Sequence, residues 1–255
     1  MTDAELTARL RANLRDFKTL QAAPSGPLRM LVLPGVRAFA LPGHPGNLFQ
    51  QQVMYEDTRS LAGALAALEA WYRELRVGSW RVPVYPGDTD AEALLARAGH
   101  RREDDVPAMG ITLDHLPPHL PPGITLEHPD DLDAVLALNT LSYGPENTGY
   151  FEAWRTRPMP SPHLYAVVLR EGGRPLAGAV SFEQGDTAGI YLVATHPEAR
   201  RRGLGALVMH AVHADARARG CSVAVLQASA MGHGLYRQLG YRDMSAWTNW
   251  VRHTG

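Results

Sequence analysis

The sequence is short of the residues that build disulfide frameworks and membrane spans. Its 255 residues contain one cysteine, Cys221, which excludes an intrachain disulfide framework and fits a reducing compartment. No apolar run approaches the roughly 20 residues needed to cross a bilayer, and Met1 to Leu20 has no apolar signal-peptide core. We therefore expect a cytoplasmic protein with no membrane partner, in which Cys221 is a small buried residue and not a reactive thiol.

Net charge is also small, because the formal value is -1 and charged residues make up 20% of the chain. This balance gives no reason to expect nucleic acid as a partner. Lys18 is the only lysine, and we attribute the preference for arginine to the codon usage of a GC-rich genome. Positive charge is concentrated at one place, the run Arg200-Arg201-Arg202.

Hydrophobic and turn-forming residues divide the chain into two patterned halves. The proline-rich segment 115–122 has little helix or sheet propensity and is the best candidate for a linker. It separates an N-terminal domain, 1–114, from a C-terminal domain, 123–255. Strands are expected at 28–33, 36–41, 48–55, 80–85, 106–113, 124–126, 164–170, 176–182, 189–195, 222–227 and 244–252, and helices at 4–20, 59–75, 88–98, 129–141, 203–219 and 232–239.

The two halves end in a similar order of helix, glycine, strand, helix and glycine. Residues 94–101 resemble residues 235–242 at the end of the second half. This order favours an internal duplication, although two unrelated α/β segments that end their helices in glycine are the alternative. Only the second half has the arginine-glycine run, and it has Tyr236 where the first half has Leu95. If the halves are sister domains, the first therefore lacks the chemistry.

The segment 193–206 indicates an anion-binding turn. A strand ends, the chain turns at Pro197, and a glycine-rich stretch opens a helix. The first N–H groups of a helix have no intrahelical partner and its dipole makes that end positive. Gly203 and Gly205 allow a bulky anion to approach the backbone, and the three arginines add charge. The pattern favours a pyrophosphate cradle, with a solvated basic helix start as the alternative.

The same residues resemble a known motif. Arg200, Gly203 and Gly205, followed by Leu235-Tyr236 and Leu239-Gly240-Tyr241, resemble the acyl-CoA motif of the GNAT superfamily of N-acetyltransferases. The resemblance runs from Ile124 to Arg252. It implies an α/β fold of two GNAT-like lobes, the first one degenerate, each a mixed, mostly antiparallel sheet flanked by helices. It also implies acetyl-CoA as co-substrate and direct transfer of the acyl group to a small-molecule or peptide amine.

Cofactor contacts follow from the resemblance. In the family, the strand before the motif pairs with the pantetheine arm and the turn meets the diphosphate. Ser229 stands where family members often have asparagine, so this contact is altered. The residues that match cofactor-binding positions are Val193, Ala194, Thr195, Arg200, Arg201, Arg202, Gly203, Leu204, Gly205, Ala206 and Ser229.

Two residues are candidates for proton transfer. Tyr236 matches the tyrosine that family members use to protonate the leaving thiolate, although a packing role under its helix is the alternative. Glu183, at a strand end, is the best candidate for the general base, against the reading of a solvated carboxylate. His163 and His196 are weaker candidates. No histidine or cysteine spacing suits a metal, so none is expected.

Two functions remain open. The first is an N-acetyltransferase, and the second is a non-catalytic acyl-CoA-binding sensor or scaffold, which Ser229 and the unclear base favour. The acceptor and the oligomeric state cannot be read from the sequence. Acceptor loops in such folds correspond to residues 141–162, whose side chains can line a pocket or simply pack; they include Tyr143, Glu146, Tyr150, Phe151 and Trp154.

Overall fold

The computed structural model describes all residues except 23–25, 46, 114–118, 145–150, 152–160 and 254–255. The chain forms two compact units, and neither is a continuous segment. Unit 1 contains residues 1–17 and 108–244, and unit 2 contains residues 18–107 and 245–255. These bounds differ from a division at 115–122, because one piece from each end of the chain belongs to the opposite unit. Among the described helices, none is long and apolar enough to span a bilayer.

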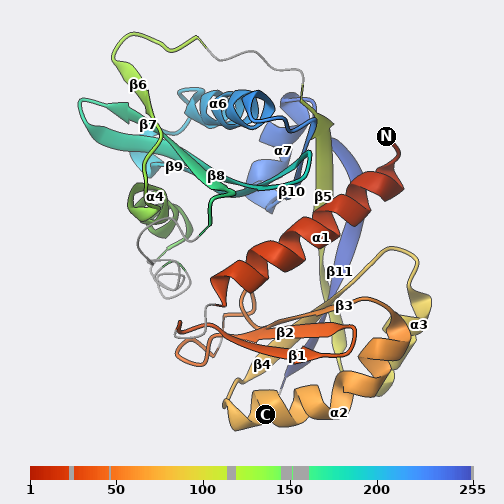
Figure 1. Ribbon diagram of the computed structural model, residues 1–255. Coiled ribbons are helices and arrows are strands. Elements are labelled where there is room, and N and C mark those ends of the chain that lie inside the picture. The colour runs from red at the N-terminus through yellow and green to blue at the C-terminus, as the bar shows by residue number, and fades with distance from the viewer. Residues whose placement is uncertain (23–25, 46, 114–118, 145–150, 152–160, 254–255) are drawn as a thin grey trace. The chain divides into compact units, whose positions relative to one another are not determined.

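Unit 1 is a six-stranded, mostly antiparallel sheet with helices on both faces (Figure 1). Its strand order is β5-β10-β9-β8-β7-β6. The elements are the first part of α1 (Asp3–Gln21), the end of β5 (Arg101–Thr112), β6 (Ile124–Glu127), α4 (Asp133–Tyr143), β7 (Leu164–Glu171), β8 (Arg174–Gln184), β9 (Thr187–Thr195), η2 (Pro197–Ala199), α6 (Leu204–Ala218), β10 (Val223–Gln227) and α7 (Ala230–Gln238).

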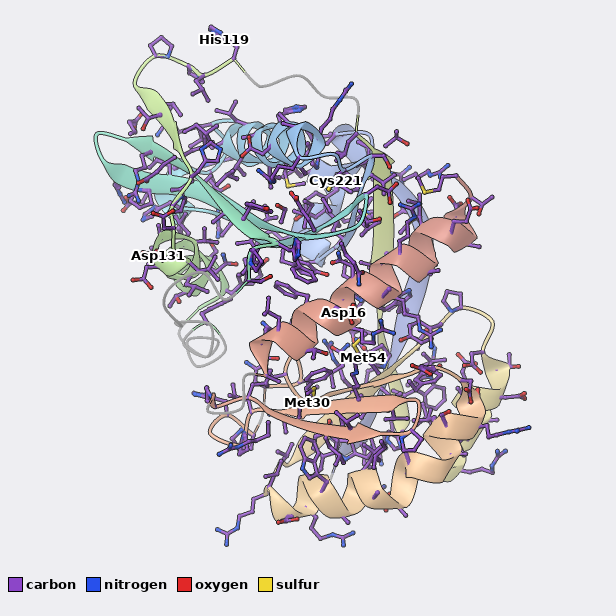
Figure 2. All side chains as sticks on the ribbon, in the orientation of Figure 1. Asp16, Met30, Met54, His119, Asp131 and Cys221 are labelled. Carbon is purple, nitrogen blue, oxygen red and sulfur yellow. The ribbon has the colours of Figure 1, made fainter. Side chains whose placement is uncertain are left out.

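Alternation along β8 separates the two faces of this sheet. Ala177 and Ala179 belong to the core beneath α6, whereas Gly178 faces Val135 and Leu138 of α4. Figure 1 shows α6 and α4 on opposite sides of β7, β8 and β9. Cys221 is buried in the core on the α6 side (Figure 2), and burial raises the pKa of its thiol to about 11. A buried thiol of this kind is unreactive at neutral pH.

Unit 2 has a sheet with the order β1-β2-β3-β4-β11, followed by residues 101–107 of β5, and α2 packs against β2 and β3. Its only lysine, Lys18, is buried, and Lys18 Nζ donates to the carbonyl of Phe49 at 2.6 Å and to Gln50 Oε1 at 2.9 Å. The elements are β1 (Arg29–Leu33), β2 (Val36–Ala40), β3 (Gln52–Tyr55), α2 (Thr58–Glu74), β4 (Ser79–Val84), α3 (Thr89–Arg97) and most of β11 (Arg242–His253). The expected strand at 48–55 is present only from Gln52 onward, because residues 48–51 form turns.

The two halves of the sequence exchange their last strands. In unit 1, β10 pairs antiparallel with residues 108–112 of β5, which come from the first half of the sequence. In unit 2, β4 pairs antiparallel with residues 248–253 of β11, which come from the very end of the chain. Each sheet is therefore completed by a strand from the other half. The α/β fold with mostly antiparallel sheets, expected from the sequence, is confirmed.

The repeated order of elements is reproduced in backbone hydrogen bonds. The N–H of His100 donates to the carbonyl of Leu95 at 2.9 Å after α3, and the N–H of Tyr241 donates to that of Tyr236 at 3.0 Å after α7. In both places the residue directly before the donor is a glycine, Gly99 or Gly240, with a positive φ angle. The helix-to-strand junctions of the two halves thus share one geometry, as a duplication predicts.

His100 differs from its counterpart Tyr241 because its buried ring has no hydrogen-bond partner among the described residues. Its side chain is 4% exposed, and neither ring nitrogen has a hydrogen-bond partner among the described residues. The ring lies edge-on to Trp80, with centroids 4.6 Å apart. Burial, together with the charge of Arg252, lowers the pKa of His100 from 6.5 to about 4. The native state therefore contains a neutral imidazole.

We expect stability to fall as the pH drops below 6.5. In the unfolded chain His100 has a pKa of 6.5, whereas in the folded chain its pKa is about 4. Between these pH values the unfolded state binds a proton that the folded state does not, so protonation favours unfolding. The loss between pH 7.5 and pH 5 should be about 2 kcal/mol. Urea unfolding at both pH values measures it. His100→Phe should remove most of this difference, and a variant with an unchanged pH dependence would assign the effect to other groups.

Candidate functional site

The central feature of unit 1 is a separation of two neighbouring strands. The parallel ladder between β9 and β10 joins residues 187–189 with 223–225 and, within these fully described strands, goes no further. β10 continues to pair with β5 as far as Gln227. The second half of β9 therefore lacks a strand on this side, and its backbone groups are available to an extended ligand.

A bulge in β9 accompanies this separation. Leu192 has φ 53, which is rare for a residue other than glycine, and the pairing with β8 shifts register between Gly178 and Val180. The carbonyl of Leu192 accepts a hydrogen bond from Asn139 Nδ2 of α4 at 2.7 Å. Three residues later, the carbonyl of Thr195 accepts one from Ser142 Oγ at 3.1 Å. The stretch expected to pair with pantetheine, 193–195, is thus fixed from α4.

The turn after β9 presents free N–H groups. Pro197 opens the short η2 helix, Arg201 has φ 63, and Gly203 caps α6 with φ 76. The N–H of Leu207 is the first to bond within α6, to the carbonyl of Gly203 at 3.0 Å. The preceding N–H groups of the helix start, those of Leu204, Gly205 and Ala206, have no intrahelical acceptor. They are oriented as an anion site requires.

The two glycines of the turn have separate roles. A side chain on Gly203 would meet nothing within 4 Å, so this glycine is needed for its positive φ angle. A Cβ on Gly205 would lie 3.1 Å from Leu235 Cδ2 and 3.5 Å from Thr195 Oγ1. Gly205 therefore allows α6 to pack closely against β9 and α7. Gly203 thus has a conformational role and Gly205 a packing role, and access of an anion to their backbone stays a prediction.

The three arginines are not equivalent. Arg202 Nη2 lies 2.6 Å from Glu171 Oε1, and this pairing holds the pKa of the Glu171 carboxyl below its usual value. Arg200 Nη2 makes a long bond of 3.5 Å to the carbonyl of Ser142. Arg201 is exposed and has no partner among the described residues. Of the three, Arg201 is the cation most available to a bound anion.

Tyr236 lies inside α7, whose start is capped by Ser229 through a bond from the N–H of Gly232 to Ser229 Oγ at 3.2 Å. The Tyr236 ring is 8% exposed, and its hydroxyl has no hydrogen-bond partner among the described residues. Burial, with a smaller contribution from Tyr143, raises the pKa of Tyr236 well above its usual value near 10. The phenol is therefore protonated at neutral pH and has a proton to donate.

Glu183 differs from the solvated carboxylate or free base expected from the sequence. Its side chain is buried, and Glu183 Oε1 lies 2.6 Å from Arg219 Nη2 at the end of α6. It faces Ala188 across the sheet, where β9 and β10 are still paired. That position is four residues before Leu192, or about 13 Å along a strand. The structure does not bring Glu183 together with the bulge.

The helix start of unit 2 at the matching point has opposite chemistry. α2 follows β3 as α6 follows β9, but its cap is Asp57, whose carboxylate accepts from the N–H of Ser60 at 2.8 Å. Glu56 stands beside it, where unit 1 has arginines. A carboxylate already occupies the positive end of α2, so a phosphate would be repelled there.

Several expected residues lie outside the described part of the chain. These are Glu146, Tyr150 and Trp154 of the acceptor region. The other two aromatic residues of that region, Tyr143 and Phe151, are described, and their ring centroids lie 6.2 Å apart. Sequence reasoning missed Asn139 and Ser142, whose only signal is their polarity on the helix. Within the described residues, no group of three or more His, Cys, Asp or Glu side chains could hold a metal.

Comparisons with known proteins identify the same region. Residues 132–241 match the family model described as the acetyltransferase (GNAT) family. No curated protein matches the sequence. A GCN5-related N-acetyltransferase from Kribbella flavida is similar in structure over 100% of this chain and 96% of its own, with TM-score 0.66 and 20% identity.

Two further solved structures are similar over most of the chain. A GCN5-related N-acetyltransferase from Sphaerobacter thermophilus covers 86% of this chain and 76% of its own, with TM-score 0.59 and 19% identity. A tandem GNAT protein from the clavulanic acid biosynthesis pathway covers 86% and 78%, with TM-score 0.61 and 18% identity. At these identities the likeness concerns the fold.

Proposed function

We propose that this chain transfers an acetyl group from acetyl-CoA to an amine, because residues 132–241 match the model of the acetyltransferase (GNAT) family. The observation that carries the proposal is the open edge of β9, which leads directly into a turn with free N–H groups and Arg201. An extended thiol arm with a diphosphate at its end fits this sequence of features. The acceptor is a small-molecule or peptide amine of unassigned identity.

Each part of the site has a role in this proposal. The backbone of residues 193–195 pairs with the pantetheine arm. The N–H groups of residues 204–206 and the guanidinium of Arg201 hold the diphosphate. Acetyl-CoA supplies the thioester whose C–S bond breaks as the amine attacks. Ser229 Oγ accepts the capping bond from the N–H of Gly232, so its O–H is left to donate to the cofactor. We expect this contact to be weaker than the one made by the asparagine that family members often have at this position.

Tyr236 supplies a proton in this proposal. A departing thiolate has a conjugate acid with a pKa of about 8.5, so a close phenol can protonate it only when held in place. The side chain of Tyr236 is 8% exposed and its hydroxyl has no hydrogen-bond partner among the described residues, which supports such a role. For removal of the amine proton, Glu183 stays a prediction, and its ion pair with Arg219 supports a structural role instead.

Calorimetric titration with acetyl-CoA tests the proposal. The wild-type chain should bind one molecule, since unit 2 has a carboxylate at its helix start. Arg201→Ala should weaken binding about tenfold, because a charge-assisted hydrogen bond is worth about 1.5–3 kcal/mol. Arg202→Ala is the matched control and should change the affinity by less than about threefold, since Glu171 already occupies its side chain.

The outcomes separate the possible readings. Equal losses of acetyl-CoA affinity in the two variants would show that the turn acts only through its net charge. Two acetyl-CoA molecules bound per chain would show that unit 2 also has a binding site. A chain that binds acetyl-CoA but releases no free thiol with any amine of a broad library would be the sensor or scaffold. Thiol release with one amine class would name the acceptor.

A further inference from the structure

One polar side chain of α4, that of Asn139, is buried and makes a hydrogen bond outside its own helix. Asn139 is 1% exposed in a helix whose neighbouring buried residues, Leu136 and Leu138, are apolar. Its Nδ2 donates to the carbonyl of Val135, one turn back, at 2.8 Å, and to that of Leu192 at 2.7 Å. Asparagine is a poor helix former, so α4 itself gains little from it. The bond that leaves the helix accounts for its presence.

The acceptor of that bond is the strained residue of β9. A residue other than glycine in the left-handed region costs on the order of 1–3 kcal/mol and persists only where its surroundings hold it. Leu192 has this conformation, and its carbonyl points to Asn139 and not into the ladder. If Leu192 relaxed to an extended conformation, the register shift would vanish. A one-residue shift turns the following side chains and backbone groups to the other face of the sheet.

A second bond fixes the other end of the same stretch. Ser142 lies one turn after Asn139 in α4, and it holds the carbonyl of Thr195, three residues after Leu192. The carbonyl of Ser142 in turn accepts the long bond from Arg200 at the start of the turn. Asn139 and Ser142, called here the α4 clamp, therefore form hydrogen bonds to β9 on both sides of Val193 and Ala194.

We propose that the α4 clamp positions the backbone of residues 193–195 for the pantetheine arm, with Asn139 as the main positioning residue. This inference rests on the proposed function. Asn139 touches neither the acyl group nor the phosphates, so its effect is transmitted through Leu192. The clamp acts on the thiol arm alone, and the diphosphate turn keeps its own N–H groups and Arg201. The two ends of acyl-CoA recognition can thus be separated by experiment.

Two ligands report the two ends. Acetyl-CoA contacts both, whereas adenosine 3′-phosphate 5′-diphosphate keeps the diphosphate but has no pantetheine arm. Asn139→Asp keeps the shape of the side chain but removes its N–H donor, and it should weaken acetyl-CoA binding about tenfold while leaving the affinity for the nucleotide unchanged. Asn139→Leu should behave alike. Arg201→Ala should weaken both ligands.

Controls keep a folding defect apart from a positioning defect. Asn139→Ser can still bond to the carbonyl of Val135 but is too short for Leu192, so it should share the loss of acetyl-CoA affinity. Circular dichroism at the assay temperature verifies that each variant is folded. Equal weakening of both ligands, or none, in folded Asn139 variants would overturn the clamp. A wild-type chain that binds neither ligand would instead overturn the proposed function.

Discussion

Tyr236→Phe is expected to slow acetyl transfer by about 10²–10⁴-fold while acetyl-CoA still binds, because general acid catalysis is worth that much. The ring packs beside Gly232 and lies 5.7 Å from that of Tyr241, contacts that phenylalanine keeps. Only the hydroxyl, which has no partner among the described residues, is lost. Stability should therefore change little. The loss should appear in kcat more than in KM for acetyl-CoA.

A second buried tyrosine provides the matched control. The hydroxyl of Tyr241 lies 2.7 Å from His213 Nε2 inside the core. Tyr241→Phe breaks this bond and should cost about 1–3 kcal/mol of stability without slowing the chemical step. Single-turnover measurements keep product release from masking the effect. A Tyr236→Phe variant with the wild-type single-turnover rate from about pH 6 to 9 would make Tyr236 a packing residue.

The fragment 119–255, which contains the whole proposed site, is expected not to fold on its own. It lacks residues 108–112 of β5, which cover β10, and the first part of α1. That helix contributes Asn13, whose Nδ2 donates to the carbonyl of Phe182 at 3.0 Å and whose Oδ1 accepts from the hydroxyl of Tyr191 at 2.7 Å. Without these parts, β10 becomes an exposed edge strand, which favours aggregation.

Expression of the fragment with and without the complementary fragment 1–118 measures this dependence. Alone, 119–255 should be insoluble or lack cooperative unfolding, and it should not bind acetyl-CoA. Together the two fragments should regain a cooperative transition, because 1–118 supplies both β5 and α1. A fragment 119–255 that folds and binds acetyl-CoA with the affinity of the full chain would show that the exchanged strand is dispensable.

Local features were predictable because each depends on a few neighbouring residues. Two adjacent glycines, Gly172 and Gly173, are typical of a hairpin, and both have positive φ angles between β7 and β8. An aspartate before a helix favours a cap, and Asp88 caps α3 by accepting from the N–H of Ala91. The strand exchange was not predictable in this way. The pattern of β5 identifies a strand but not its partner, since pairing is decided by contacts far along the sequence.

The same distinction applies to the site. The turn that we propose to bind an anion could be predicted because its residues are consecutive, and its geometry follows from one helix start capped by Gly203. The pairing of Arg202 with Glu171 and of Glu183 with Arg219 joins residues that are 31 and 36 positions apart. Nothing in the sequence distinguishes these paired side chains from Arg201. Asn139 was missed for the same reason, because its acceptor lies 53 residues away.

The burial of Lys18 bears on how the chain would tolerate the thioester that we propose as its co-substrate. A thioester reacts with accessible amines, and the lysine side chain is the usual target of such modification. Here the single lysine amine is enclosed in unit 2 and bonded to Phe49 and Gln50, while every other basic side chain of this kind is a guanidinium. Guanidinium groups keep their proton at physiological pH and are poor nucleophiles. Under the proposed function, acylation of the chain's own lysine is therefore disfavoured, and the acetyl group is left for the acceptor.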